Sequence, residues 1–428
     1  MAETLTARER AFNHEDGVTI ADMLARIADA MEGKQHTVIY GFHYNGNEAD
    51  PDASVSYLED AVGLTPLAVN LNTGICEYGS WKHAFFMPKP CMLKFSGIVD
   101  YYLNPNDYTL KDDGSASDNA NIDYAGNCMM EFPQIWWKIV PDSGDSSSFS
   151  FYCSNTQIDS SYHAWNCFDK NNMIKNHFYV SAYQGCEDSS NRLRSISGKV
   201  HSKNKNASAI MTLAEACGSG WQIDTWADRL LLWMLCILVT KSTASQEKLG
   251  LGHSTDSWTD ANMLASGTMD KKGLFFGNSN SGTGGDGVKV FGIENYWGDQ
   301  WRWTAGLVND NGTLKYKLTQ GTADGTSVSD YNADASGYLS AGVSAPSGTS
   351  GGYINKVEAT SSGVYPVVAS GSQSTYMCDG LWFNNSQINF SLFGGDLDYE
   401  RQCGVSCFLL NGPPSGAGWY RGSGVSYR

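Results

Sequence analysis

The chain has 428 residues, with 29 basic and 45 acidic side chains and a formal net charge of −16. Its length allows about two to four domains, and 17% charged residues, 12% aromatic residues and 46 glycines indicate a loop-rich globular protein rather than a disordered one. The acidic balance argues against a nucleic-acid partner and against an anionic membrane surface, because both are bound through clustered Lys and Arg.

The N-terminal segment, residues 1–35, is predicted to be mainly one helix. Apolar side chains recur between residues 4 and 32 at steps of three, four, seven and eight residues, and Gly33 is a suitable stop. Two interpretations of its apolar stripe stay open: packing on its own domain, and self-association or docking to a larger assembly. Residues Met1 to Ala11 carry no apolar signal-peptide core, so synthesis in a cytoplasm is expected.

Short strands are predicted over residues 36–150. The stretches HTVIYGFHY, PCMLKFSGIVDYYL and MMEFPQIWWKIV are rich in β-branched and aromatic residues, and Asn, Asp and Gly clusters separate them. Residues 151–176 are predicted to be a linker or loop, and residues 177–428 a second β-rich domain. The predicted fold class is therefore α+β and β-rich, with an N-terminal helix, a β-domain and a C-terminal domain.

One strong helix is predicted from Asp224 to about Thr240. Asp224 or Thr225 can cap its N-terminus. Its middle, Leu230 to Val239 (LLLWMLCILV), is apolar all round, which predicts a buried helix. This run is too short to cross a bilayer core, which needs about 20 residues, so no membrane insertion is expected.

Signatures of catalysis are not evident in the sequence. There is no H-E-x-x-H and no G-x-x-x-x-G-K-[ST], and the eight His show no metal-ligand spacing. The odd number of Cys, eleven, argues against a disulfide framework and favours small core residues. Asp396 and Asp398 are predicted to be exposed loop acids, because nothing near them would raise one pKa. We therefore expect no enzymatic activity, no metal and no cofactor.

The most specific segment is Gly292 to Gly306, with the sequence GIENYWGDQWRWTAG. Gly298 permits a turn that bulky residues cannot adopt. Trp301 and Trp303 lie two residues apart and so face the same side of a strand, where we expect them in the core. A G-[ND]-x-W-x-W segment is similar to the core motif of the C-type-lectin-like fold shared by formylglycine-generating enzymes and phage variable proteins.

Other segments agree with this resemblance in order. FYVSAYQG, RLRSISG and GSGWQIDTWADRLLL are similar to successive parts of that domain, and the segments from YGFHY to MEFPQIWWKI resemble an N-terminal β-domain common in phage tail-associated proteins. The resemblance covers about residues 38–310. It implies a phage tail-type domain over 36–150 and a C-type-lectin-like domain over 177–428, with a Gly/Ser/Thr-rich insertion at about 307–375.

The C-terminal residues 384–428 resemble the variable region of proteins diversified by retroelements. Such regions keep a fixed frame, which corresponds here to Gly394-Gly395, Cys403-Gly404, Trp419 and Gly424-Val-Ser. Between the frame positions lie residues that Asn codons become through adenine mutagenesis, such as Asp, Tyr and Gly. The resemblance implies a ligand-binding face made of Phe393, Asp396, Leu397, Asp398, Tyr399, Glu400, Cys407, Phe408, Asn411, Gly412, Gly416, Gly418 and Tyr420.

The function implied by the resemblance is that of a retroelement-diversified receptor-binding protein at a phage or prophage tail fibre. Its expected partners are a bacterial surface protein or glycan, other virion tail proteins and further copies of itself in a homotrimer. Its expected location is the virion. Two alternatives stay open: a bacterial surface adhesin of the same fold, and an oxidase of the formylglycine-generating type.

Overall fold

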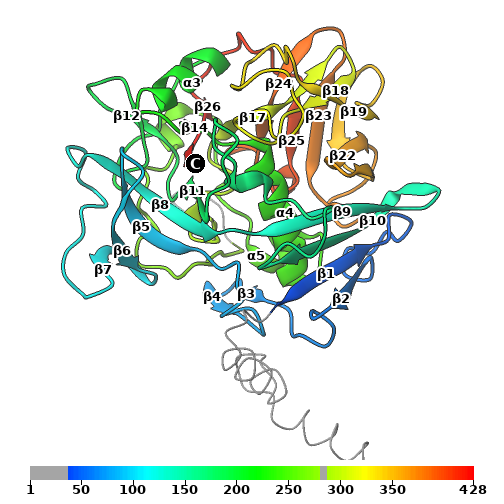
Figure 1. Cartoon of the computed structure of the whole chain (residues 1–428), viewed down its shortest axis with the longest axis horizontal. Helices are drawn as coiled ribbons and strands as arrows, with labels where there is room; N and C mark the ends of the chain where they lie inside the picture. Colours follow the sequence, from blue (N-terminus) through cyan, green and yellow to red (C-terminus); the bar gives the residue numbers. More distant parts are fainter. Residues whose placement is uncertain (1–36, 280–286) are drawn as a thin grey trace, which may run out of the picture.

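The computed structural model describes residues 37–279 and 287–428 (Figure 1). It is β-rich with few helices, which confirms the predicted β-rich α+β class. The helix predicted within residues 1–35 lies outside the described residues.

A four-stranded antiparallel sheet contains the first strand of the described chain. Its order is β2-β1-β10-β9, and the register places Phe42 opposite Phe151. Phe42 packs on both Phe149 and Phe151, and all three rings are buried in the core. The strands are β1 (Ile39–Tyr44), β2 (Val55–Glu59), β9 (Trp136–Asp142) and β10 (Asp145–Ser154).

A seven-stranded sheet brings together strands from both halves of the chain, in the order β14-β27-β11-β8-β5-β6-β7. Strand β11 pairs with β8 on one side and with β27, near the C-terminus, on the other. The strands are β5 (Lys89–Lys94), β6 (Val99–Asn104), β7 (Asp107–Lys111), β8 (Gly126–Pro133), β11 (His177–Ser181), β14 (Trp221–Ile223) and β27 (Val425–Tyr427).

The third large sheet has eight strands, in the order β19-β18-β17-β24-β25-β23-β20, and β26 pairs with β17. Strand β17 carries Trp301 and Trp303, and both are buried as predicted. The strands are β17 (Trp301–Asp310), β18 (Thr313–Tyr316), β19 (Leu339–Ser344), β20 (Thr349–Tyr353), β23 (Gly380–Asn384), β24 (Ile388–Phe393), β25 (Phe408–Leu410) and β26 (Arg421–Gly422).

Short hairpins and helices complete the described chain. The hairpins are β3 (Ala68–Asn70) with β4 (Ile75–Glu77), β12 (Cys186–Glu187) with β13 (Leu193–Arg194), β15 (Lys289–Val290) with β16 (Ile293–Glu294), and β21 (Lys356–Thr360) with β22 (Gly363–Val368). The α-helices are α3 (Ala207–Glu215), α4 (Trp226–Thr240) and α5 (Ser245–Leu249), and the 3-10 helices are η1 (Trp165–Cys167), η2 (Asp260–Asn262) and η3 (Glu400–Gln402).

Helix α4 is the predicted buried helix, and it lies in the middle of the molecule (Figure 1). Thr225 caps it by accepting a hydrogen bond from the Asp228 amide, and every residue of the helix is buried. The Leu67 amide donates to the carbonyl oxygen of Val239 near the end of the helix. Helix α4 is thus enclosed by segments from both predicted domains.

The predicted domain limits at residues 150 and 177 do not separate two cores. The predicted linker 151–176 begins inside β10, and the seven-stranded sheet joins β5 to β8 directly to β11 and β27. One apolar cluster extends from Phe42 through helix α4 to Phe408. The segments 36–150 and 177–428 therefore share strands and a core.

Candidate ligand-binding surface

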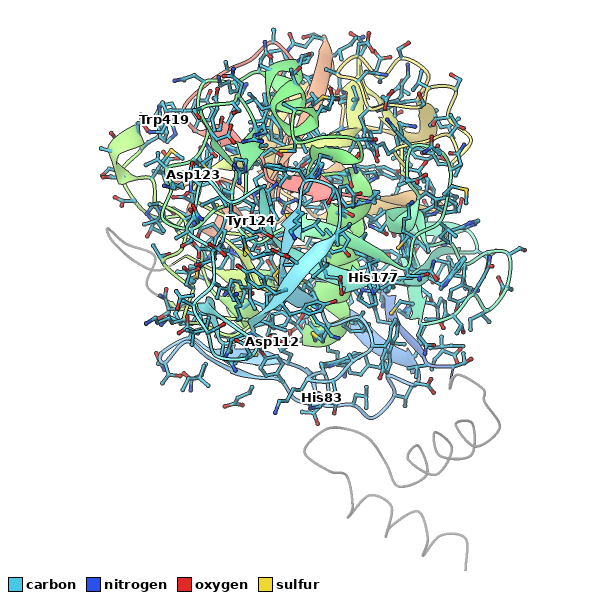
Figure 2. All side chains as sticks on the ribbon, turned by 60° about the vertical axis from the view of Figure 1, so that its left-hand side comes forward. His83, Asp112, Asp123, Tyr124, His177 and Trp419 are labelled. Carbon is cyan, nitrogen blue, oxygen red and sulfur yellow. The ribbon has the colours of Figure 1, made fainter. Side chains whose placement is uncertain are left out.

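Five aromatic side chains gather at one part of the surface, which we call the aromatic surface. They come from the loop before η2, from β23 and from two C-terminal loops. Figure 2 shows Trp419 at the rim of the molecule, at the opposite end from His83. Trp258 is 53% exposed and the other four are half-buried. The members of the aromatic surface are Trp258, Trp382, Tyr399, Trp419 and Tyr420.

The rings of the aromatic surface pack in two groups. The centroid of the Trp258 ring lies 5.3 Å from that of Trp419 and 5.3 Å from that of Tyr420. Tyr399 packs edge-on against Trp382, at 4.7 Å, and against buried Trp301, at 5.2 Å. Because edge-to-face pairs at such distances are favourable, the rings hold one another in place while part of each stays accessible.

Residues of the Trp-rich motif hold the turn that carries Trp419 and Tyr420. The Gln300 side-chain amide donates to the Trp419 carbonyl oxygen at 2.8 Å, and the Trp301 amide donates to the Tyr420 carbonyl oxygen at 3.0 Å. The Arg421 guanidinium lies 5.2 Å from the centre of the Tyr420 ring, which is a cation–π distance. The buried motif therefore positions the exposed rings.

The loop that carries Trp258 is attached to the same motif through a buried His–Asp cluster. The Asp299 carboxylate lies 2.8 Å from His253 Nδ1 and 2.8 Å from His201 Nε2, and all three side chains are buried. Gly298 has a φ of +76°, and a Cβ there would lie 2.7 Å from the His253 carbonyl oxygen. Glycine at this position therefore provides both the turn and the close approach of His253.

Seven of the predicted face residues lie at or near the surface. Asp398 and Glu400 are exposed, whereas Tyr399 and Tyr420 are half-buried members of the aromatic surface. The remaining three are partly exposed loop residues: Asn411, Gly416 and Gly418.

The other six predicted face residues are buried, which corrects their assignment to direct ligand contact. Phe393 and Phe408 face each other on β24 and β25, and their ring centroids are 4.4 Å apart. Phe393 also stacks on Trp226 of helix α4. These rings belong to the core because neighbouring strands place them on the helix side of the sheet. The six buried residues are Phe393, Asp396, Leu397, Cys407, Phe408 and Gly412.

Asp396 is not the exposed loop acid that the sequence predicts. Its side chain is only 1% exposed, and burial, followed by the nearby carboxyl group of Asp398, raises its pKa. The sequence analysis missed this effect because burial of the loop depends on its neighbours: the Asp256 amide donates to the carbonyl oxygen of Leu397.

A second buried carboxyl group holds the turn between the two C-terminal loops. Asp379 accepts hydrogen bonds from the amide and the hydroxyl group of Ser406, both at 2.8 Å, and burial raises its pKa to about 8. A Cβ at Gly404 would lie 2.1 Å from Asp379 Oδ1. Glycine is therefore required at the frame position 404, because any larger residue would collide with the Asp379 carboxylate.

Three members of the aromatic surface are absent from the predicted face: Trp258, Trp382 and Trp419, the last of which the sequence analysis assigned to the fixed frame. Trp258 lies in the polar stretch HSTDSWTD, where no aliphatic neighbour provides a core contact. An isolated Trp in such a stretch is a recognisable signal of a surface ring. Trp382 gives no such signal, because its strand also carries buried Leu381 and Phe383.

The described residues hold no group of three or more His, Cys, Asp or Glu side chains arranged for a metal ion. All eleven Cys are free thiols and ten of them are buried, which confirms the prediction of small core residues. Among the helices of residues 37–279 and 287–428, none is long and apolar enough to cross a membrane.

No protein-family model and no curated protein matches the chain. The solved structures to which its structure is similar, at low scores, include the following three. The U1 variant of Major Tropism Determinant has 10% identity, with 80% of this chain and 72% of that chain covered, and a TM-score of 0.29. PvdO from Pseudomonas aeruginosa has 11% identity, with 71% of this chain and 95% of that chain covered, and a TM-score of 0.29. The P3c variant of Major Tropism Determinant has 11% identity, with 92% of this chain and 72% of that chain covered, and a TM-score of 0.26. Similarity at this level transfers no residue role to this chain.

Proposed function

We propose that the chain is a receptor-binding protein of a phage or prophage tail and that its aromatic surface contacts a ligand on the bacterial cell. The observation that carries the proposal is the aromatic surface itself, in which Trp258 is 53% exposed and packs on Trp419 and Tyr420, while buried Trp301 supports Tyr399. Large, rigid aromatic side chains give contact area at a low cost in conformational entropy, as in antibody loops. The chain acts by binding, without enzymatic activity and without a cofactor.

The proposal includes a C-type-lectin-like fold for residues 177–428 and a retroelement-diversified C-terminal region. The motif GDQWRW supports the fold, because its buried residues hold the loops that carry the surface. The predicted face contains seven accessible residues beside six buried ones, and this separation supports diversification of the accessible positions. Substitutions at exposed positions usually change stability by less than about 0.5 kcal/mol, so such positions can vary while the fold persists.

Natural variation in the gene is expected to follow this division. Exposed and half-exposed positions such as Asp398, Tyr399, Glu400 and Tyr420 should vary between members of a natural population. The six buried residues of the predicted face should stay constant, because variation there would disrupt the core. Sequencing the 3′ end of the gene across a population, together with the flanking DNA, checks this. Equal variation at buried and exposed codons, or none at all, contradicts diversification of this surface.

The proposed setting is the virion, with the chain assembled as a homotrimer. Residues 1–35 are proposed to join the copies to one another or to other tail proteins. Several copies presented together convert weak single contacts into strong attachment. A monomer mass measured by light scattering at micromolar concentration would contradict the trimer. It would not bear on ligand binding by the aromatic surface, which has its own test.

Loss of two aromatic rings is expected to weaken binding to cells. The purified full chain, fluorescently labelled, should bind a subset of a panel of bacterial isolates in flow cytometry. The double variant Trp258→Ala/Trp419→Ala should bind those isolates at least about tenfold more weakly, because central aromatic residues contribute about 2 kcal/mol or more each at interfaces.

The matched control removes exposed apolar side chains elsewhere. Val62 and Ile98 are 67% and 64% exposed, so Val62→Ala/Ile98→Ala removes accessible apolar area while leaving the aromatic surface intact. This control should bind like the unmodified chain. Unchanged binding of the Trp258→Ala/Trp419→Ala variant, or a panel on which no isolate binds, contradicts the proposed function.

A further inference from the structure

A small cavity lies where the C-terminal end of helix α3 meets strands β14 and β17 and the segment 320–331. Its volume is about 10 Å³, which is the space that one water-sized particle occupies. Figure 1 shows α3 and β14 together in the upper half of the molecule. The polar residues of the lining are Glu215, Gln222, Gln320, Asp330 and Tyr331.

Two buried amide groups at this cavity have no hydrogen-bond partner among the described residues. Gln222 on β14 is 5% exposed, and neither its Oε1 nor its Nε2 is paired. Gln320 is 8% exposed, and its Oε1 is also unpaired. Because an unpaired buried amide is unfavourable, two of them at one small cavity indicate a species that their oxygen atoms contact.

Two carboxylates line the same cavity. Glu215 is the last residue of α3, and Asp330 precedes Tyr331. Burial, followed by the negative charge of Asp330, raises the pKa of Glu215. The carbonyl groups at the C-terminal end of α3 add partial negative charge. Since no Lys, Arg or His lines the cavity in the part of the chain that the structure describes, these groups favour a cation there.

The ammonium group of Lys317 acts on Asp330 but does not neutralise the cavity. Its Nζ donates to three oxygen atoms of the segment 321–328, and Asp324 influences it more strongly than Asp330 does. Lys317 together with the three carboxylates of Glu215, Asp324 and Asp330 carries a net charge of −2. This is the charge that one divalent cation balances.

We propose that this cavity binds a calcium ion. Glu215 and Asp330 supply carboxylate oxygens, and Gln222 and Gln320 supply amide oxygens. Both carboxylates are also exposed to solvent, so water can complete the about six to eight oxygen ligands that Ca²⁺ takes. Zinc and copper prefer nitrogen and sulfur donors, and Mg²⁺ demands a more regular geometry than donors from separate segments provide.

The proposed ion would join parts of the chain that are far apart in the sequence. It would attach the segment 320–330, which lies in the predicted Gly/Ser/Thr-rich insertion, to helix α3 and strand β14. The sequence analysis expected no metal because donors at positions 215, 222, 320 and 330 show no metal-ligand spacing. This site goes beyond the proposed receptor binding and does not depend on it.

The test uses Tb³⁺, which occupies calcium sites and luminesces when a nearby aromatic ring transfers energy to it. Tyr331 lines the cavity and can act as the donor. The full chain, freed of metal with EGTA and desalted, should give saturable luminescence, and Ca²⁺ should displace Tb³⁺ with a Kd of about 0.1–1 mM, as in weak calcium sites. Mg²⁺ should need at least about tenfold higher concentration. Absence of saturable luminescence, or equal displacement by Mg²⁺ and Ca²⁺, overturns the proposal.

A pair of charge variants locates the site. Glu215→Gln/Asp330→Asn should weaken Ca²⁺ binding at least about tenfold, because calcium affinity depends on the charge of the ligands. The matched control Glu77→Gln/Asp112→Asn removes two exposed acids elsewhere and should bind Ca²⁺ like the unmodified chain. Unchanged Ca²⁺ binding in the cavity variant overturns the proposal.

The variant Gln222→Met distinguishes a built site from general attraction of cations to an acidic chain. It keeps both carboxylates and removes only the unpaired amide. In EGTA its midpoint of thermal unfolding should be no lower than that of the unmodified chain, because no hydrogen bond within the described residues is lost. Added Ca²⁺ should raise the midpoint of the unmodified chain and raise that of Gln222→Met less. An equal rise in both, or no rise in the unmodified chain, overturns the proposal.

Discussion

Replacement of Asp299 by Ala is expected to lower the free energy of unfolding by about 3–5 kcal/mol, the usual cost of breaking a buried ion pair by removing one partner. Asp299 is fully buried and accepts from His201, from His253 and from the Leu264 amide. All three donors would lose their acceptor at once. Urea denaturation followed by circular dichroism measures the change.

The control for this variant is an exposed acid in the same region. Asp260 pairs with Lys203 at the surface, and its side chain is about half exposed. Asp260→Ala should therefore cost less than about 1 kcal/mol. Hydrogen exchange at the Leu264 amide should accelerate only in the Asp299 variant. A change of less than 1 kcal/mol in the Asp299 variant would show that the cluster does not hold the loop.

The pH dependence of stability should identify the same cluster. Burial opposes charge on His253, but the hydrogen bonds and negative charges of Asp299 and Asp256 outweigh it and raise its pKa above 6.5. The stabilisation from protonated His253 is therefore complete below about pH 6.5 and is lost as the pH rises through the higher folded-state pKa. Burial opposes the charge on Asp299, but its two histidines lower its pKa, so its own contribution is lost progressively as the pH falls below about 4. The difference between the unmodified chain and the Asp299→Ala variant should be largest at about pH 5–6 and should narrow as the pH rises above about 6.5.

Replacement of Phe408 by Ala is expected to cost about 3–5 kcal/mol in the free energy of unfolding, the range for removal of a buried Phe side chain. Its ring is fully buried and packs on Phe393, Trp226 and Trp233, with the last two in helix α4. Removal would leave a cavity that the surrounding rings cannot close. The measurement is the urea midpoint together with the slope of the transition.

The matched variant is Tyr420→Ala, which removes a half-buried ring of the aromatic surface. It should cost less than about 1 kcal/mol in stability, because most of the ring's partners are themselves at the surface. Its effect should be on binding to cells instead. Weaker cell binding by the Phe408→Ala variant with unchanged stability would contradict the burial of Phe408 and return it to the ligand-contacting face.

The sequence predicted those parts of the fold that depend on residues close together in the chain. Helix α4 follows from its Thr225 cap and its apolar run, and the burial of Trp301 and Trp303 follows from their spacing in a strand. The predicted domain limits do not match the sheets, because strands that are far apart in the sequence pair with one another. No pattern in residues 126–133 indicates that β8 pairs with β11, or that β11 pairs with residues 425–427.

The candidate site was predicted in part for a similar reason. The resemblance selected residue types and loop positions, and it located Tyr399 and Tyr420 on the surface. It gave no information about which side of β24 and β25 faces helix α4, so Phe393 and Phe408 were assigned to the wrong side. Trp258 lies outside the resembling tail, and non-local contacts hold its loop beside the tail: the His253–Asp299 pair and the hydrogen bond from the Asp256 amide to Leu397.

The position of β27 has a consequence for the order of folding during synthesis. Residues 425–427 lie between β14 and β11, inside the seven-stranded sheet rather than at its edge. Until residues 425–427 have been synthesised, β11 and β14 expose backbone groups that pair only with β27. Such unpaired strands are prone to aggregation. A nascent chain of this protein therefore has a period of vulnerability that ends only when residues 425–427 have left the ribosome, and chaperones that bind nascent chains are expected to act during that period.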